Sequence, residues 1–140
     1  MARFVQGYYT LKNPHKYIGD PSKVRYMSSY ELEMHKFLDN NERVLHWGSE
    51  EIAIPYIKPT DGKVHKYYVD YFVEYINKDG EIVKELIEVK PFKETHKPRK
   101  QNLYEQITFA INVAKWQAAT LFAKQQGWKF RIITEKSIFK

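Results

Sequence analysis

The chain has 140 residues, 43% of them hydrophobic and 16% aromatic, which is enough to bury one substantial core and excludes a disordered protein. Lysine and arginine outnumber the acidic residues by 23 to 17, and the resulting net charge of +6 favours a polyanionic partner. Cysteine is absent, which excludes disulfides and cysteine-bound zinc. No apolar run reaches about 18 residues, so we expect a soluble protein of the cytoplasm that contacts no membrane.

We expect a single domain over residues 1–140, with an irregular arm over residues 1–27 and an α/β core over residues 28–140. The arm mixes tyrosines, basic residues and turn formers without a clear period. Two interpretations remain open. The arm contacts a phosphate backbone through bases such as Arg25, or it wraps around the core with its tyrosines as cover.

Residues 28–39 are predicted to form the first helix. Ser28 and Glu31 have the spacing of a capping box, and an apolar stripe follows at helical period. At about 100° per residue, Glu31 also lies beside Leu38 at the margin of that stripe. Glu31 therefore has two possible roles, as part of a helix cap or as an acid that points toward a sheet.

Four strand-like segments follow this helix. Short strands are predicted over residues 43–47 and 51–57, and Pro55 favours an edge position or a bulge for the second. Residues 64–76 and 81–90 form two longer runs, joined by a tight polar turn. We expect these two runs to pair as a buried hairpin.

An acid on the first run and an acid and a lysine on the second form the pattern D-x17-E-V-K, from Asp70 to Lys90. Because residues two apart share a face of a strand, a hairpin in suitable register brings Asp70, Glu88 and Lys90 together. Two close carboxylates repel each other, and a divalent cation relieves that repulsion. A neighbouring ammonium then suits phosphodiester hydrolysis. The alternative is an exposed ion pair, which contributes under about 1 kcal/mol.

A basic segment with two prolines, residues 91–101, follows this pattern directly. Its bases are Lys93, Lys97, Arg99 and Lys100. Such a segment beside a metal site could clamp a phosphate backbone, or it could be an ordinary solvated linker.

A long helix is predicted over residues 103–126, with Gly127 as its stop, and a strand over residues 128–134. The helix carries two apolar stripes on roughly opposite faces, so we expect the sheet to cover one and the arm or a partner protein the other. Asn112 and Lys115 fall between the stripes, and the pattern assigns them neither to a site nor to the fold. The order helix, strands, helix, strand predicts an α/β sandwich with a mixed sheet.

Together these motifs resemble the PD-(D/E)xK restriction-endonuclease-like superfamily. More narrowly, the chain is similar to the head-completion nucleases of tailed bacteriophages and to the endonuclease subunits of certain heteromeric transposases. Short segments along nearly the whole chain carry this likeness: K-Y-I-G-D-P, S-S-Y-E-L-E, F-L-D-N-N, W-G-S-E-E, D-G-K-V-H-K-Y-Y-V-D, I-E-V-K-P, N-V-A-K-W-Q-A-A and F-R-I-I-T-E. Val69 stands where the superfamily usually has a proline, and Met27 where the family often has a base.

The resemblance implies a restriction-endonuclease-like core, in which a mixed β-sheet is flanked by helices. It implies a set of four catalytic residues: Glu31, Asp70, Glu88 and Lys90. Asp70, Glu88, Glu31 and the backbone carbonyl of Val89 are then the ligands of Mg²⁺, which Mn²⁺ can replace. DNA is the expected partner, and its expected contacts are Arg25, Lys93, Lys97, Arg99, Lys100 and Lys115.

The expected function is that of a Mg²⁺-dependent DNA endonuclease in phage head completion. It would process DNA after packaging and before tail attachment, in the host cytoplasm or on the virion, in contact with head or neck proteins. One alternative is a non-catalytic head-completion protein that binds DNA ends. A second is a nuclease like the Holliday-junction resolvases, which needs a dimer to cut two strands; the sequence leaves the oligomeric state open.

Overall fold

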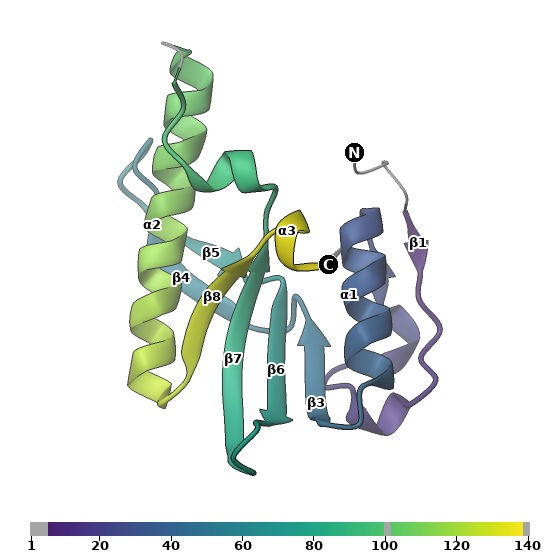
Figure 1. Ribbon diagram of the computed structural model, residues 1–140. Helices are drawn as coiled ribbons and strands as arrows, with labels where there is room; N and C mark the ends of the chain where they lie inside the picture. Colours follow the sequence, from purple (N-terminus) through teal and green to yellow (C-terminus); the bar gives the residue numbers. More distant parts are fainter. Residues whose placement is uncertain (1–5, 100–101, 139–140) are drawn as a thin grey trace.

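A four-stranded sheet forms the centre of the computed structural model, which describes residues 6–99 and 102–138 (Figure 1). Its strands, in spatial order, are β3 (Val44–Ser49), β6 (Tyr71–Ile76), β7 (Ile82–Val89) and β8 (Lys129–Ile133). The first three are antiparallel, whereas β8 runs parallel to β7. The predicted mixed sheet of an α/β fold is therefore confirmed.

Two long helices lie on opposite faces of this sheet, α1 (Ser29–Asn40) beside β3 and α2 (Leu103–Gln126) beside β8 (Figure 1). Because successive side chains of a strand face opposite sides, the buried residues of the sheet divide into two apolar clusters, one on each face. Tyr71 and Val73 join the apolar cluster beneath α1, whereas Phe72 joins the cluster that contacts α2. Both faces of β6 are thus buried, as expected for a central strand.

Local signals set the ends of both helices close to the predicted residues. The Ser28 hydroxyl accepts the Glu31 N–H at 3.2 Å, which caps α1. At α2 the Asn102 side chain accepts the Glu105 N–H at 3.2 Å. Gly127 ends α2 with φ 77°, a left-handed conformation that glycine adopts without steric cost.

A separate two-stranded sheet, β4 (Ala53–Ile57) with β5 (Val64–Tyr68), packs against α2. The prediction that residues 64–76 form one strand is wrong, because the run breaks between β5 and β6. Val69 donates its N–H to the Ile52 carbonyl at 3.2 Å, and the Asp70 carbonyl accepts the Glu50 N–H at 3.0 Å. At these two residues the chain passes from one sheet to the other. Pro55 lies on an edge strand, as predicted.

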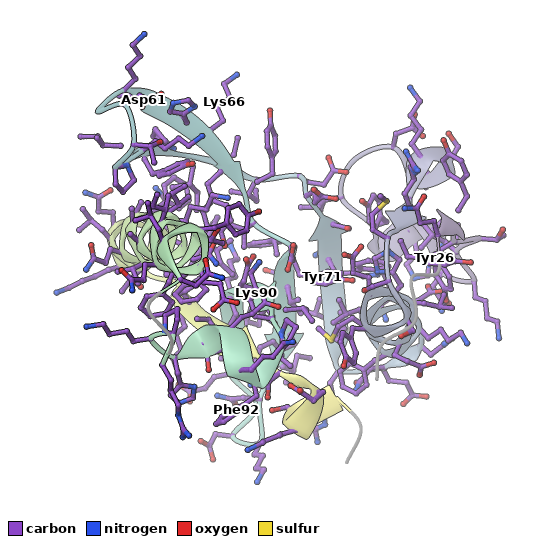
Figure 2. All side chains as sticks on the ribbon, turned by 90° about the horizontal axis from the view of Figure 1, so that it is seen from above. Tyr26, Asp61, Lys66, Tyr71, Lys90 and Phe92 are labelled. Atoms are coloured by element: carbon purple, nitrogen blue, oxygen red, sulfur yellow. The ribbon has the colours of Figure 1, made fainter. Side chains whose placement is uncertain are left out.

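The N-terminal arm lies against α1 and β3, across the molecule from α2 (Figure 1, Figure 2). Its elements are β1 (Gly7–Tyr8), η1 (Pro14–Lys16), η2 (Pro21–Lys23) and β2 (Arg25–Tyr26), with β1 and β2 paired. Tyr17 enters the core, and Lys16 is buried. For these two residues the interpretation of the arm as a wrap is confirmed.

The second apolar stripe of α2 is only partly covered among the residues that the structure describes. Thr120 is exposed, Phe109, Val113 and Trp116 are half-buried, and Ala123 is buried. The arm lies on the far side of the sheet, so the suggestion that it covers this stripe is wrong. Within residues 6–99 and 102–138, no helix combines the length and apolar character needed to span a bilayer.

Candidate active site

The acids and the lysine of the D-x17-E-V-K pattern meet at one end of the central sheet, where β7 ends and β6 begins (Figure 1). Tyr71 pairs with Ile87, and the same antiparallel register places Asp70 beside Glu88. Lys90 donates its backbone N–H to the Ile133 carbonyl at 2.9 Å, which extends the pairing of β7 with β8. Lys90 lies near the centre of this end of the molecule (Figure 2).

Asp70 is tied to the end of β7 by its side chain. Its Oδ2 accepts the Val89 N–H at 2.8 Å. The N–H and C=O of a strand residue point to the same side, so the Val89 carbonyl also faces Asp70. The role of this carbonyl as a metal ligand stays a prediction.

Glu88 is only 5% exposed, which rules out the alternative of an ordinary exposed ion pair. Its two oxygens have different partners. Oε1 accepts the Tyr67 hydroxyl at 2.7 Å, and Oε2 lies 3.9 Å from the Lys90 ammonium. Burial and the charge of Glu88 raise the pKa of Tyr67 well above its ordinary value, so the hydroxyl keeps its proton and donates.

Of the two roles that the helix pattern left open for Glu31, the structure shows the helix cap. The Glu31 N–H binds the Ser28 cap, and its Oε1 accepts the Met27 N–H at 3.0 Å. Burial raises the pKa of its carboxyl, and the charges of Glu50 and Glu88 raise it further. The Glu31 carboxyl is thus part of the cap and also lies in the electric field of the site.

A hydrogen-bonded chain that the sequence did not reveal anchors α1 to the sheet beside the site. Burial lowers the pKa of His35, so the ring is neutral; its Nε2 donates to the Arg25 carbonyl at 2.8 Å, which leaves Nδ1 as an acceptor. The Tyr71 hydroxyl lies 2.7 Å from that Nδ1 and 3.1 Å from the Glu31 carbonyl. This chain fixes the position of the first turns of α1, and with them Glu31.

The site carries excess negative charge. Burial raises the pKa of Asp70 well above its ordinary value, and the charges of Glu88 and Glu31 add to the effect, while Val89 N–H and Lys90 oppose it. A raised carboxyl pKa means that the native state binds the proton more tightly than the unfolded state does. The ionised carboxyl therefore destabilises the metal-free protein.

This charge predicts a pH-dependent effect of Asp70→Asn in EDTA. The substituted amide does not titrate, and its oxygen can still accept from the Val89 N–H. We expect the melting temperature of the variant to exceed that of the wild type at neutral pH. The difference in melting temperature between the variant and the wild type should shrink as pH falls through the raised pKa of Asp70 toward its ordinary value of 3.8. Over this range the Asp70 carboxyl of the wild type regains its proton. Thermal unfolding across this range measures the difference, and a difference that stays constant or widens toward acid contradicts the assignment.

The donor set of this site fits a hard divalent cation. Asp70, Glu88 and the Val89 carbonyl offer only oxygen, and the carboxylates carry charge that a cation would neutralise. In the described part of the chain, no three acidic or histidine side chains already lie close enough to enclose an ion. The candidate ligands are two acids and a backbone carbonyl, and the charge of Glu31 also acts on Asp70.

Glu50 is a further acid of this region that the sequence pattern did not single out. Its φ of 55° is in the left-handed region, and its charge raises the pKa of Glu31. The adjacent Glu51 instead accepts the Tyr17 hydroxyl at 2.9 Å and lies against Gly19, where φ is +99° and a Cβ would clash with its carboxylate. Two consecutive glutamates thus have different roles, and no local pattern distinguishes them.

Lys115 lies on the α2 side of the site. Its ammonium is 5.8 Å from the centre of the Tyr56 ring and 5.6 Å from that of Tyr67. Burial lowers its pKa, while the charges of Glu88 and Asp70 act in the opposite direction. Lys115 thus lies beside Tyr67, which donates to Glu88, whereas Asn112 is buried on α2.

The basic segment after Lys90 begins with a 3₁₀ turn, η3 (Phe92–Thr95), and its bases Lys93, Lys97 and Arg99 are exposed. Lys100 lies outside the described residues. The short helix α3 (Glu135–Ile138) holds the start of the segment: Phe92 N–H donates to Glu135 Oε1 at 2.7 Å, and the Lys136 ammonium lies 3.5 Å from the Phe92 ring centre. Arg25 is also exposed, beside the Tyr8 ring on the arm.

Comparison with known proteins agrees with this arrangement. The family model of the TnsA-like endonuclease N terminal matches residues 41–135, which include Asp70, Glu88 and Lys90 but not Glu31. The chain is also 37% identical over 142 residues to the head completion nuclease of Enterobacteria phage T4, a match that covers 94% of this chain and 92% of that protein. The resemblance seen in the sequence is thereby confirmed, and the fold is restriction-endonuclease-like. The chain belongs to the family of TnsA-like endonucleases.

Proposed function

We propose that the protein is a Mg²⁺-dependent DNA endonuclease that acts in the completion of phage heads. The observation that carries this proposal is the pairing of Asp70 with the buried Glu88 at the ends of β6 and β7, next to Lys90. The similarity to a protein named head completion nuclease supports the biological role. Action in the host cytoplasm, on packaged DNA and beside head or neck proteins, is part of the same proposal.

Asp70, Glu88 and the Val89 carbonyl would hold the metal, and Glu31 would assist from α1. Mg²⁺ bound there supplies positive charge that polarises the scissile phosphate. Lys90 carries its ammonium beside Glu88 and is free to donate to the attacking water and to the developing negative charge on phosphate. Its backbone is fixed by Ile133, so the ammonium is held near the reacting groups.

The exposed bases after Lys90 would contact the phosphate backbone, together with Arg25 and Lys115. A variant that replaces Lys93, Lys97 and Arg99 by Gln should bind DNA more weakly and with less dependence on salt. Each lost phosphate contact is expected to reduce the slope of log K against log salt by about 0.9. Fluorescence anisotropy in Ca²⁺, across a range of salt concentrations, measures that slope.

A matched control replaces three exposed lysines at the opposite end of the sheet, Lys78, Lys84 and Lys129, by Gln. It removes the same net charge, so any long-range electrostatic effect is shared by the two variants. If both variants change the slope equally, the segment after Lys90 has no specific role in DNA binding.

One incubation series tests the proposed activity. Supercoiled plasmid and branched DNA are treated with the protein in Mg²⁺, Mn²⁺ or EDTA. Cleavage in either metal and none in EDTA supports the proposal. Salt-dependent binding with no cleavage in any condition would instead indicate a non-catalytic DNA-end-binding protein. Cleavage of branched DNA alone, by a dimer in light scattering, would indicate a junction-resolving nuclease.

A further inference from the structure

A buried hydrogen bond joins the two sheets at the candidate site. The Tyr67 hydroxyl, on β5 of the two-stranded sheet, donates to Glu88 Oε1, on β7 of the central sheet, at 2.7 Å. Tyr67 is 4% exposed and Glu88 is 5% exposed. The buried hydroxyl of Tyr67 has its partner within the protein. The resemblance to the nuclease superfamily assigns no role to this residue.

We propose that Tyr67 is a positioning residue that makes Glu88 a monodentate metal ligand and thereby favours Mg²⁺ over Ca²⁺. The Tyr67 hydroxyl takes one lone pair of Oε1, so Oε2, which accepts no hydrogen bond from Tyr67, is the oxygen more open to a cation. This inference rests on the proposed function, in which Glu88 binds the metal.

Both partners of the bond are held in place by their surroundings. Tyr67 pairs with Ile54 in the small sheet, and its ring lies 6.5 Å from the Tyr56 ring in an edge-on arrangement. Glu88 pairs with Ile132 in the central sheet. Because strand pairing holds both backbones, the hydroxyl restricts the rotation of the Glu88 carboxylate.

The geometry of this carboxylate matters because the two cations differ in what they require. Mg²⁺ takes a near-ideal octahedron with one oxygen from each carboxylate, whereas Ca²⁺ accepts more oxygens and often binds a carboxylate through both. Bidentate binding by Glu88 would place the cation on Oε1 as well, where it competes with the Tyr67 hydroxyl for the charge of that oxygen and weakens their hydrogen bond. The bond therefore opposes the coordination mode that Ca²⁺ uses best.

The variant Tyr67→Phe removes the hydroxyl and keeps the ring, and with it the packing against Tyr56 and the contact with Lys115. Calorimetric titration of the DNA-free protein with Mg²⁺ and, separately, with Ca²⁺ is the experiment. Loss of a group that orients a ligand typically weakens metal binding by about 10- to 100-fold, and we expect a loss of about 10-fold for Mg²⁺. Ca²⁺ binding should fall less or improve, so the ratio of Ca²⁺ to Mg²⁺ affinity should rise. A ratio equal to that of the wild type overturns the proposal.

Tyr9→Phe is the matched control, because the Tyr9 hydroxyl also donates to a carboxylate, Asp39 Oδ2 at 2.8 Å, on the arm and away from the site. It should lower the melting temperature and leave the ratio of Ca²⁺ to Mg²⁺ affinity unchanged. An equal change of this ratio in both variants overturns the proposal.

The variant Glu88→Gln separates the role proposed for Tyr67 from the metal site proposed at Glu88. If it loses Mg²⁺ affinity while Tyr67→Phe keeps the wild-type ratio, only the role of Tyr67 fails. If Glu88→Gln keeps Mg²⁺ affinity and cleavage, the proposed site fails and this inference fails with it.

Discussion

Glu88→Gln is expected to reduce Mg²⁺-dependent DNA cleavage by about 10³-fold, since groups that merely orient a ligand already contribute about 10- to 100-fold. The amide keeps an oxygen that can accept from Tyr67, so packing around residue 88 is preserved. It also removes one of the negative charges that raise the pKa of Asp70. In EDTA the melting temperature should therefore stay the same or rise. Single-turnover cleavage and thermal unfolding measure the two effects.

The same strand offers a control for this substitution. Glu85 is 4% exposed, as buried as Glu88, but its Oε1 lies 3.1 Å from Arg131 Nε, and the strand period of two places it on the opposite face of β7. Glu85→Gln should lower stability and leave cleavage within a small factor of the wild type. Wild-type cleavage by Glu88→Gln would refute the assignment of the site, and so would equal losses in both variants.

Lys16→Met is expected to lower the free energy of unfolding by about 3 kcal/mol, the largest stability effect we expect of a substitution on the arm. Lys16 is only 8% exposed, and its ammonium donates to the carbonyls of Leu38, Asp39 and Asn41 at 2.9, 2.9 and 2.8 Å. These carbonyls lie at the end of α1, where a helix lacks internal donors and attracts positive charge. Methionine fills similar space but leaves them without this donor. Urea unfolding followed by circular dichroism measures the loss.

Lys12→Met provides the comparison within the same arm. The Lys12 side chain is exposed, and its contact with Asp39 is made by the backbone N–H at 2.8 Å, which the substitution keeps. We expect a change within about 0.5 kcal/mol. If the two variants have the same urea midpoint, the cap at the end of α1 does not stabilise the fold.

The sequence predicted most accurately those features that depend on neighbouring residues. Ser28 and Gly127 are local signals. The helix α1 begins directly after Ser28, and α2 ends directly before Gly127. The mixed sheet also follows from the order of the elements, although the division of the strands into separate sheets does not. The break before β6 was missed, because the alternating pattern continues through Asp70 and only the pairing with distant residues shows that the chain changes sheets.

For the candidate site, too, the sequence predicted the residues that belong to a short pattern and not those that depend on distant partners. Asp70, Glu88 and Lys90 came from a short pattern, and the strand register places them together as expected. Tyr67 has no local signal, since its partner is 21 residues away and any tyrosine on a buried strand could serve the core alone. For the same reason no pattern separates Lys16 from the exposed bases of the arm: its carbonyl partners are more than 20 residues away.

The passage of the chain between two sheets at Asp70 makes the geometry of the site depend on the weaker of them. A two-stranded sheet is only marginally stable by itself, and β4 and β5 are supported mainly by their packing on α2 through residues such as Ala119 and Ala123. This small sheet carries Tyr67, and it is covalently continuous with Asp70. Substitutions of the side chains by which α2 packs against this small sheet are therefore expected to shift Tyr67 and Asp70 relative to β7, even where they alter neither an acid nor a predicted DNA contact.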